Sequence, residues 1–314
     1  MCASAILCGG IFYKYNRRSM PFEQELIQKI AGAHGIKGDV HLMPASGMVN
    51  EAWLLDDRFV LRITVADDAF DEAPREAWIV PIVRKAGALS PEIVVADLSH
   101  TIIDRPYTIY RKADGVLLGE LEDDPERYAV AYREVGREFA KLHAIGINEE
   151  DRSRLRGPST FDASKQLKQA KEAGKIGDDE ATLVNELIIE LAPRIGDRSE
   201  CALVHNDVHP WNMFVDPVTR KLTAIIDWGD TSWGDPAGEF ASMPLAAVPH
   251  MLEGYQEAGG QVTDNLVAKS MHFGLALCLW EVRDLDPARF KRQWWRHSPN
   301  GFGEDVEAIR RLLD

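Results

Sequence analysis

The stretch LVHNDVHPWN, residues 203–212, is the most informative part of this chain. It places two histidines, an aspartate and two asparagines directly after a short apolar run. A buried strand or helix accommodates so many polar side chains only if each has a hydrogen-bond partner. The stretch therefore predicts a loop that carries a functional site.

The residues that follow predict a β-hairpin, with strands at NMFVD (212–216) and LTAIID (222–227). Asp207, Asn212 and Asp227 are then expected at the same end of this hairpin. Two carboxylates and an amide oxygen suit magnesium, which binds a few protein oxygens together with phosphate oxygens and water. The spacing therefore predicts a magnesium site formed from among these three side chains.

Composition predicts a soluble globular protein that divides into two lobes. The chain has 314 residues, 45% of them hydrophobic and 27% charged, which is enough for a large core. Its formal charge of −14 repels phosphate backbones and anionic membrane surfaces, so we expect no nucleic-acid or membrane partner. The 4 cysteines show no paired metal spacing and no disulfide density, which favours a cytoplasmic location.

The first 20 residues differ from the rest of the chain. An apolar run at 3–12 precedes the basic residues Lys14, Arg17 and Arg18, which is the reverse of the order in a secretory signal. The run is also too short to span a bilayer. We expect an extension that precedes a more natural start at Met20, with a membrane-anchoring tail as the alternative.

Residues 21–111 predict a small sheet with one or two helices. FEQELIQKIAGAHG (22–35) has a helical apolar face and ends at a glycine, and residues 40–65 predict strands joined by turns. A helix is predicted over 73–87, which Pro81 should kink or end early. Two further strands are expected within 92–115.

Residues 112–314 are rich in helical patterns. The segments 131–145 and 178–195 predict strong amphipathic helices. The fold class is therefore α+β, with a small N-terminal antiparallel-sheet lobe and a larger helical C-terminal lobe.

The loop resembles that of a known enzyme family. His205, Asp207 and Asn212 stand where the kinase loop H-R-D-L-x-x-x-N has its His, Asp and Asn, and DWG at 227–229 stands where D-F-G does. His209 with the following proline makes the loop similar to H-G-D-x-H-x-x-N of the aminoglycoside phosphotransferase family.

This resemblance covers about residues 21–314 and is sharp from 203 to 240. It implies a bilobal protein-kinase-like fold with a nucleotide-binding lobe at 21–111 and a catalytic and substrate-binding lobe at 112–314. Residues 1–20 have no counterpart in the family pattern.

The resemblance also implies a nucleotide site in the first lobe. The residues concerned are Ser46, Gly47 and Asn50 in the phosphate-covering hairpin, Arg62 in place of the usual lysine, Glu76 as its partner, and Tyr110, Arg111 and Lys112 beside the base. Without the loop motif, the hairpin would be an ordinary turn. Arg62 and Glu76 would equally be a surface ion pair of little consequence.

The chemistry that the family implies is phosphoryl transfer from ATP or GTP with Mg²⁺. Its transition state spreads negative charge over the transferred group, so catalysis rests on positioning and cations. Asp207 is expected to orient a substrate hydroxyl and accept its proton, while Asn212 and Asp227 hold the metal. His205 and His209 are expected to complete the catalytic loop.

The acceptor is expected to be a cationic small molecule bearing a hydroxyl group. The acidic residues that suit it are Asp230, Asp235, Glu239, Glu281 and Asp284, with Trp280, Trp294 and Trp295 near in sequence. Asp235 and Glu239 would otherwise cap and brace a helix, and the aromatics would belong to the core.

The predicted function is antibiotic O-phosphotransfer that confers resistance, by a monomer or a weak dimer. The alternatives are a metabolic kinase for choline, homoserine or a thio-sugar, and an inactive nucleotide-binding module.

Overall fold

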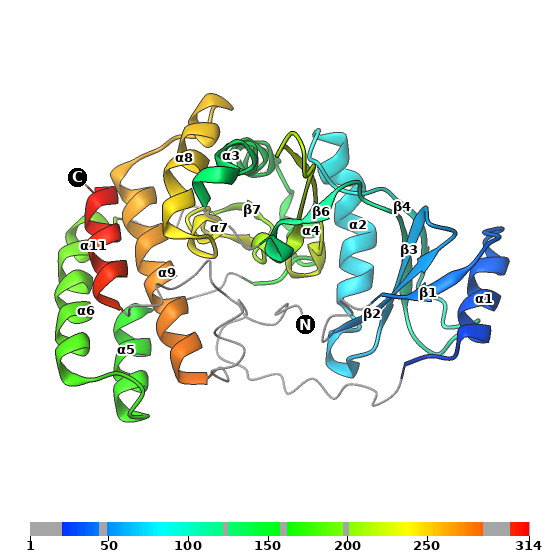
Figure 1. Ribbon diagram of the computed structural model, residues 1–314, viewed down its shortest axis with the longest axis horizontal. Coiled ribbons are helices and arrows are strands. Elements are labelled where there is room, and N and C mark those ends of the chain that lie inside the picture. Colours follow the sequence, from blue (N-terminus) through cyan, green and yellow to red (C-terminus); the bar gives the residue numbers. More distant parts are fainter. Residues whose placement is uncertain are drawn as a thin grey trace.

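The computed structural model describes residues 21–43, 49–121, 125–157, 162–196, 201–284 and 302–313. These residues form a sheet lobe and a helical lobe that lie side by side (Figure 1). The predicted α+β class and the order of the two lobes are confirmed. The predicted extension at 1–20 and the turn residues Ser46 and Gly47 lie outside the described residues.

The sheet lobe contains a five-stranded antiparallel sheet. Its order is β1 (Val40–Leu42), β2 (Asn50–Leu55), β3 (Phe59–Thr64), β5 (Tyr107–Arg111) and β4 (Ile93–Asp97). Residues 56–58 join β2 to β3, and Asp56 and Asp57 have φ angles of 50° and 51°, so they are the two left-handed central residues of a turn in which Arg58 N–H donates to Leu55 O at 3.2 Å. Helix α1 (Gln24–Ala33) buries Ile27 and Ile30 in the core of this lobe.

Helix α2 (Glu72–Lys85) connects the two lobes. Its residues Ile79, Val80 and Val83 are fully buried in the core cluster of the helical lobe, although the helix follows β3 in the chain. The helix does not end at Pro81, so the prediction of an early end is wrong. Burial of apolar side chains on both sides of the proline offsets the backbone hydrogen bond that it removes.

The helical lobe is built around two closely packed helices, α3 (Ala129–His143) and α8 (Val248–Glu257). A Cβ atom on Gly136 would lie 1.9 Å from Met251 O, and one on Gly254 would lie 1.8 Å from Arg133 O. The two backbones therefore approach so closely that only glycine fits at these positions. The other helices are α4 (Glu149–Arg152), α5 (Ala163–Glu172), α6 (Asp178–Leu191), α7 (Gly238–Ala241), α9 (Asp264–Asp284) and α11 (Phe302–Leu313).

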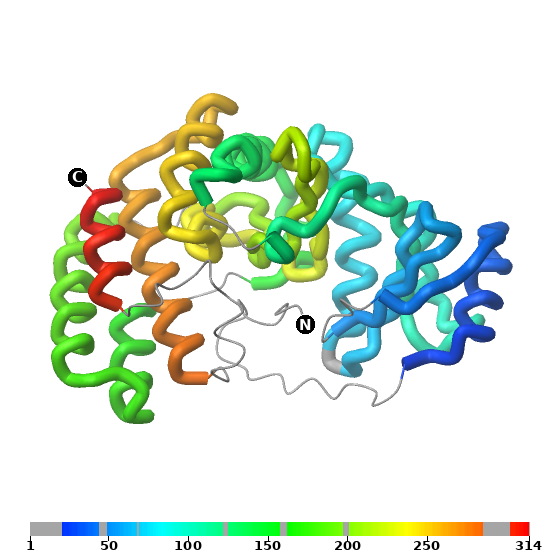
Figure 2. The backbone as a smooth tube through the Cα atoms, in the orientation of Figure 1, coloured from blue at the N-terminus to red at the C-terminus, as the bar shows by residue number. Residues whose placement is uncertain are grey.

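Short strands of the helical lobe position the polar loop. β8 (Met213–Val215) pairs with β9 (Leu222–Ile225) and with β6 (Val116–Leu117), and β7 (Ala202–Val204) pairs antiparallel with β10 (Ser232–Gly234). The predicted hairpin is thus present. The loop at 205–212 begins directly after β7, and the segment that follows β9 ends at β10, the strand paired with β7. Figure 2 follows the backbone from β5 into this lobe through residues 112–115.

Short 3₁₀ helices link these elements. They are η1 (Asp67–Ala69), η2 (Leu118–Glu120), η3 (Pro125–Tyr128), η4 (Ala192–Arg194), η5 (Pro210–Asn212), η6 (Trp228–Asp230) and η7 (Leu245–Ala247). Among the described residues, no helix combines the length and the apolar character that crossing a membrane requires.

Candidate active site

The polar loop holds its side chains inside the protein. Asp207, His209 and Asn212 are each only 1% exposed. Asn212 Nδ2 donates to Asp207 O at 2.8 Å and to Asp207 Oδ2 at 3.1 Å, and His209 Nε2 lies 3.6 Å from Asp207 Oδ1. Trp211 N–H donates to His209 Nδ1 at 3.2 Å, and Asn212 Nδ2 lies 3.4 Å from His209 Nε2. The carboxylate of Asp207 therefore lies between the amide of Asn212 and the ring of His209.

His205 and Glu239 brace this loop from behind. The His205 ring packs against Trp228 with centroids 4.5 Å apart, and its Nε2–H donates to Ile226 O at 3.1 Å. Burial lowers the pKa of His205 to about 4, so the ring is neutral at pH 7. Glu239 Oε1 accepts hydrogen bonds from the backbone N–H groups of His205 and Asn206. These bonds hold Asn206 in its left-handed conformation, with φ at 70°.

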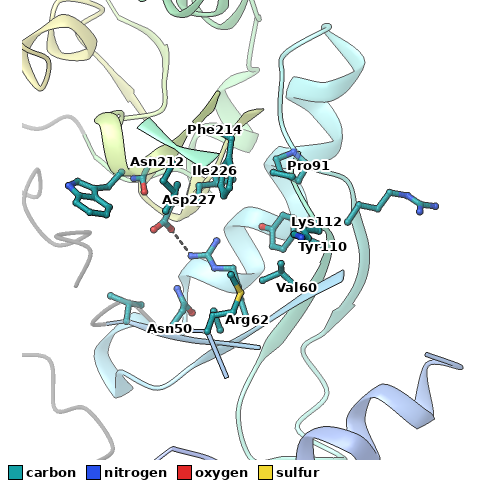
Figure 3. Close-up of a pocket in the computed structure, with 17 residues that line it drawn as sticks. Asn50, Val60, Arg62, Pro91, Tyr110, Lys112, Asn212, Phe214, Ile226 and Asp227 are labelled. Carbon is teal, nitrogen blue, oxygen red and sulfur yellow. Dashed lines mark hydrogen bonds and ion pairs between the residues drawn. The ribbon is translucent and has the colours of Figure 1, made fainter. Parts of the chain in front are cut away.

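Arg62 joins the two lobes at the opposite side of the site. From β3 it donates to Asp227 Oδ1 at 2.6 Å (Figure 3), and it also donates to Glu76 Oε1 at 2.6 Å. Tyr110 O–H donates to the other oxygen of Glu76 at 2.8 Å. Burial raises the pKa of Glu76 and the positive charge of Arg62 opposes this rise. The pair is thus an enclosed bridge to Asp227 and not a surface ion pair.

Arg62, Tyr110, Asn212 and Asp227 line one cleft between the lobes. The cleft has a volume of about 990 Å³, including its open mouth. Most of its wall is apolar and is formed by Val49, Ala52, Val60, Pro91, Leu117, Phe214 and Ile226. The residues that connect the lobes, Tyr110, Arg111, Lys112 and Ala113, line a second part. The polar lining residues are Asn50, Arg62, Asn212 and Asp227. Arg62 and Asp227 meet on one side of this space, and Lys112 lies on another (Figure 3). The side chain of Arg111 is directed to an exposed ion pair with Glu92 at 2.6 Å.

The polar end of the cleft suits a magnesium ion. Asn212 Oδ1 is buried and has no hydrogen-bond partner among the described residues, so an acceptor stands ready there. The carboxylate of Asp227 faces the same cleft. The described residues contain no group of three His, Cys, Asp or Glu side chains that could hold a metal. One amide oxygen and one carboxylate match Mg²⁺, which takes its remaining ligands from phosphate and water.

The acidic residues that follow the loop do not form an exposed wall. Asp230 pairs with Arg156 at 2.9 Å and Asp235 pairs with Lys269 at 3.1 Å. The carboxylate of Glu239 is committed to the loop backbone. These three side chains brace the interior because a buried carboxylate is costly unless a donor or a cation faces it.

Two predicted acceptor residues lie on α9. Glu281 is fully buried, and Asp284 pairs with the adjacent Arg283. Trp280 is half-buried against the main core, while Trp294 and Trp295 lie outside the described residues. The described part of the chain therefore does not bring the five predicted carboxylates together.

Comparison with known proteins identifies the family. A family model described as the phosphotransferase enzyme family matches residues 43–269, which include the cleft and the polar loop. The chain belongs to this family. It is a kinase-like phosphotransferase.

Solved structures of antibiotic phosphotransferases share the fold of this phosphotransferase. The GDP and kanamycin complex of APH(2″)-IIIa matches with a TM-score of 0.64 at 17% identity, covering 93% of this chain and 100% of that one. The spectinomycin phosphotransferase APH(9)-Ia, in complex with ADP and spectinomycin, matches with 0.63 at 13% identity, covering 93% and 100%. The macrolide 2′-phosphotransferase MphH from Brachybacterium faecium matches with 0.61 at 18% identity, covering 89% and 99%. No curated protein sequence gives a match.

The sequence motifs of this phosphotransferase do not include the residues that join α2 to the site. Glu72 and Arg75 lie on the same face of α2 as Glu76 and are buried, and Arg156 lies in the segment after α4. The available signal was the spacing of charged residues one turn apart in a helix whose other positions are mostly apolar. Charges on the buried face of a helix indicate partners elsewhere in the chain.

Proposed function

We propose that this phosphotransferase moves the γ-phosphoryl group of a nucleoside triphosphate to a hydroxyl group of a small molecule. One observation carries the proposal. An apolar slot beside the connection between the lobes leads to Arg62, Asn212 and Asp227, and Asn212 is bonded directly to Asp207.

The nucleotide binds in the cleft with its base between Val60 and Phe214, next to the connecting residues 110–113. Its phosphates extend toward Arg62, Asn50 and the metal-binding pair Asn212 and Asp227. Mg²⁺, when bound, neutralises the charge of the phosphates. Ser46 and Gly47 remain predicted phosphate-covering residues.

Asp207 serves as the catalytic base. The acceptor oxygen forms a bond to the γ-phosphorus as the bond to the bridging β–γ oxygen breaks, and the hydroxyl proton passes to Asp207. The nucleoside diphosphate leaves with the bond electrons. Asn212 and His209 hold the carboxylate in place, while His205 supports the loop. Such positioning is the main source of rate in phosphoryl transfer.

The acceptor is an antibiotic in this proposal. Support comes from the kanamycin, spectinomycin and macrolide enzymes among the similar structures, and from the charge of −14, which favours a cationic ligand. The internal pairing of Asp230, Asp235 and Glu239 removes these residues from direct contact with an amine. In this proposal the positive charge of the acceptor is attracted by the net negative charge of the protein and by other residues of the helical lobe.

The test is a phosphate-incorporation screen with ATP and with GTP. The acceptors are aminoglycosides, spectinomycin, macrolides, choline, homoserine and a thio-sugar, and Asp207→Asn is the control. Asp207→Asn should lower kcat at least about 100-fold with nucleotide affinity near that of the wild type. Turnover of a metabolic acceptor alone would overturn the antibiotic assignment. No turnover with any hydroxyl compound would overturn the proposed transfer.

A further inference from the structure

Three buried side chains connect helix α2 to the segment that follows Asp227. Arg156 Nη2 lies 3.1 Å from Glu72 Oε1, and Arg156 Nε lies 2.9 Å from Asp230 Oδ1. The three side chains are only 15%, 4% and 8% exposed, in the order Arg156, Glu72, Asp230. One guanidinium from the helical lobe therefore holds a carboxylate of the lobe-spanning helix and a carboxylate of the site segment together.

Backbone contacts reinforce this connection. Arg75 of α2 donates from Nη1 to Gly229 O and from Nε to Arg154 O, the latter at 3.2 Å. Arg156 N–H donates to Thr231 O at 3.1 Å. A Cβ atom on Gly229 would lie only 3.1 Å from the Glu72 side chain, so α2 packs directly on the turn at 228–230. The helix and the turn therefore move as a unit.

Asp227 depends on that turn for its direction. It has φ at 71° and ψ at 60°, a left-handed conformation that non-glycine residues keep only when the surroundings enforce it. The next three residues form η6, whose last residue is Asp230. Fixing Asp230 and Gly229 fixes the chain immediately after the strained residue.

We propose that Arg156 is a positioning residue for phosphoryl transfer, because its bridge between Glu72 and Asp230 sets the orientation of Asp227 for the magnesium nucleotide. This inference rests on the proposed function of the cleft. Without the guanidinium, two buried carboxylates face each other and repel. The contact of α2 with the turn is then weakened at Glu72, which lies one helical turn before Glu76, the partner of Arg62.

The test compares variants by calorimetry of Mg-nucleotide binding without acceptor, and by steady-state kinetics. Arg156→Met should raise the Kd of the Mg-nucleotide about 10- to 100-fold, the range typical when a residue that orients a metal ligand is lost. The KM of the nucleotide and the Mg²⁺ concentration needed for half-maximal rate should rise with it. The KM of the acceptor should stay near that of the wild type. Arg156→Lys keeps the charge but not the planar geometry of the guanidinium. Its Kd for the Mg-nucleotide should lie between those of the wild type and Arg156→Met.

Arg152→Met is the matched control. Arg152 belongs to the same region, and its described contacts stay within the helical lobe, where it packs over the Trp233 ring at 4.1 Å and donates to Ile147 O. This variant loses the same charge and should keep the nucleotide Kd within about twofold of the wild type. Thermal melts of all variants separate lost affinity from lost folding.

A second variant covers the case in which Arg156→Met fails to fold. Glu72→Gln/Asp230→Asn keeps the shapes and removes both charges that Arg156 joins, and its Kd should rise about tenfold. If this double variant, or a folded Arg156→Met, has the Kd of the wild type, the positioning role of Arg156 is overturned and the proposed function is not. Absence of Mg-nucleotide binding by the wild-type protein would overturn the proposed function and this inference with it.

Discussion

Replacing Arg62 by methionine should destabilise the protein strongly. The change leaves Glu76 and Asp227, whose side chains are only 4% and 13% exposed, without the guanidinium that lies 2.6 Å from each. Removing one partner of a buried ion pair costs about 3–5 kcal/mol. Because the Arg62 side chain is 15% exposed, water reaches part of the site, and we expect about 2–4 kcal/mol. For a chain of this size that loss lowers Tm by roughly 3–6 °C.

The loss should depend on pH in a defined direction. Burial already raises the pKa of Glu76 above its usual 4.5, and Arg62 opposes this. In Arg62→Met the pKa of Glu76 rises further, so the folded state binds a proton that the unfolded state releases above about pH 4.5. An acidic group whose pKa is raised in the folded state makes the protein less stable as pH rises from the unfolded pKa toward the folded pKa. The deficit relative to the wild type should therefore be smaller at pH 5 than at pH 8.

The assay is thermal and urea unfolding of both proteins at the two pH values. Arg58→Met is the control, because Arg58 is a cation on the strand connection before β3 whose side chain is 67% exposed in its pair with Asp56. Its loss should cost less than about 0.5 kcal/mol. A Tm of Arg62→Met within about 1 °C of the wild type at pH 8, or a deficit that grows on acidification, would refute the reasoning.

Three further changes test other parts of the structure. Asp227→Ala should abolish Mg²⁺-dependent nucleotide binding, and calorimetry that shows unchanged affinity would remove Asp227 from the metal site. Gly254→Ala should cost at least about 1–3 kcal/mol, because its Cβ would lie 1.8 Å from Arg133 O, and wild-type urea unfolding would contradict that close packing. His143, whose pKa burial lowers to about 3, should make the protein lose stability as pH falls from 6.5 toward 3. Replacing His143 by glutamine should reduce that slope by up to about 1.4 kcal/mol per pH unit, and an unchanged slope measured by urea unfolding at several pH values would count against it.

Local patterns explain why much of the fold was predictable. The strands of the sheet lobe, the turn at Asp56 and Asp57, and the hairpin after Asn212 each follow from residues that are neighbours in the chain. Pro81 shows the limit of such reasoning. Its local preference opposes a helix, yet burial of Ile79, Val80 and Val83 in the core keeps α2 continuous to Lys85.

The amino-acid sequence was enough to show the family resemblance and the residues of the loop. His205, Asp207 and Asn212 lie within a few positions of one another, so their spacing can be seen without the fold. Only the tertiary structure decided which charges face the cleft and which brace the interior. Arg62 and Asp227 are 165 positions apart, and Glu72 and Arg156 are 84 apart. Whether a carboxylate contacts a ligand or an internal cation depends on what packs against it after folding. Asp230 is therefore a residue type that suits a cationic substrate, but in the folded protein it pairs with the internal cation Arg156.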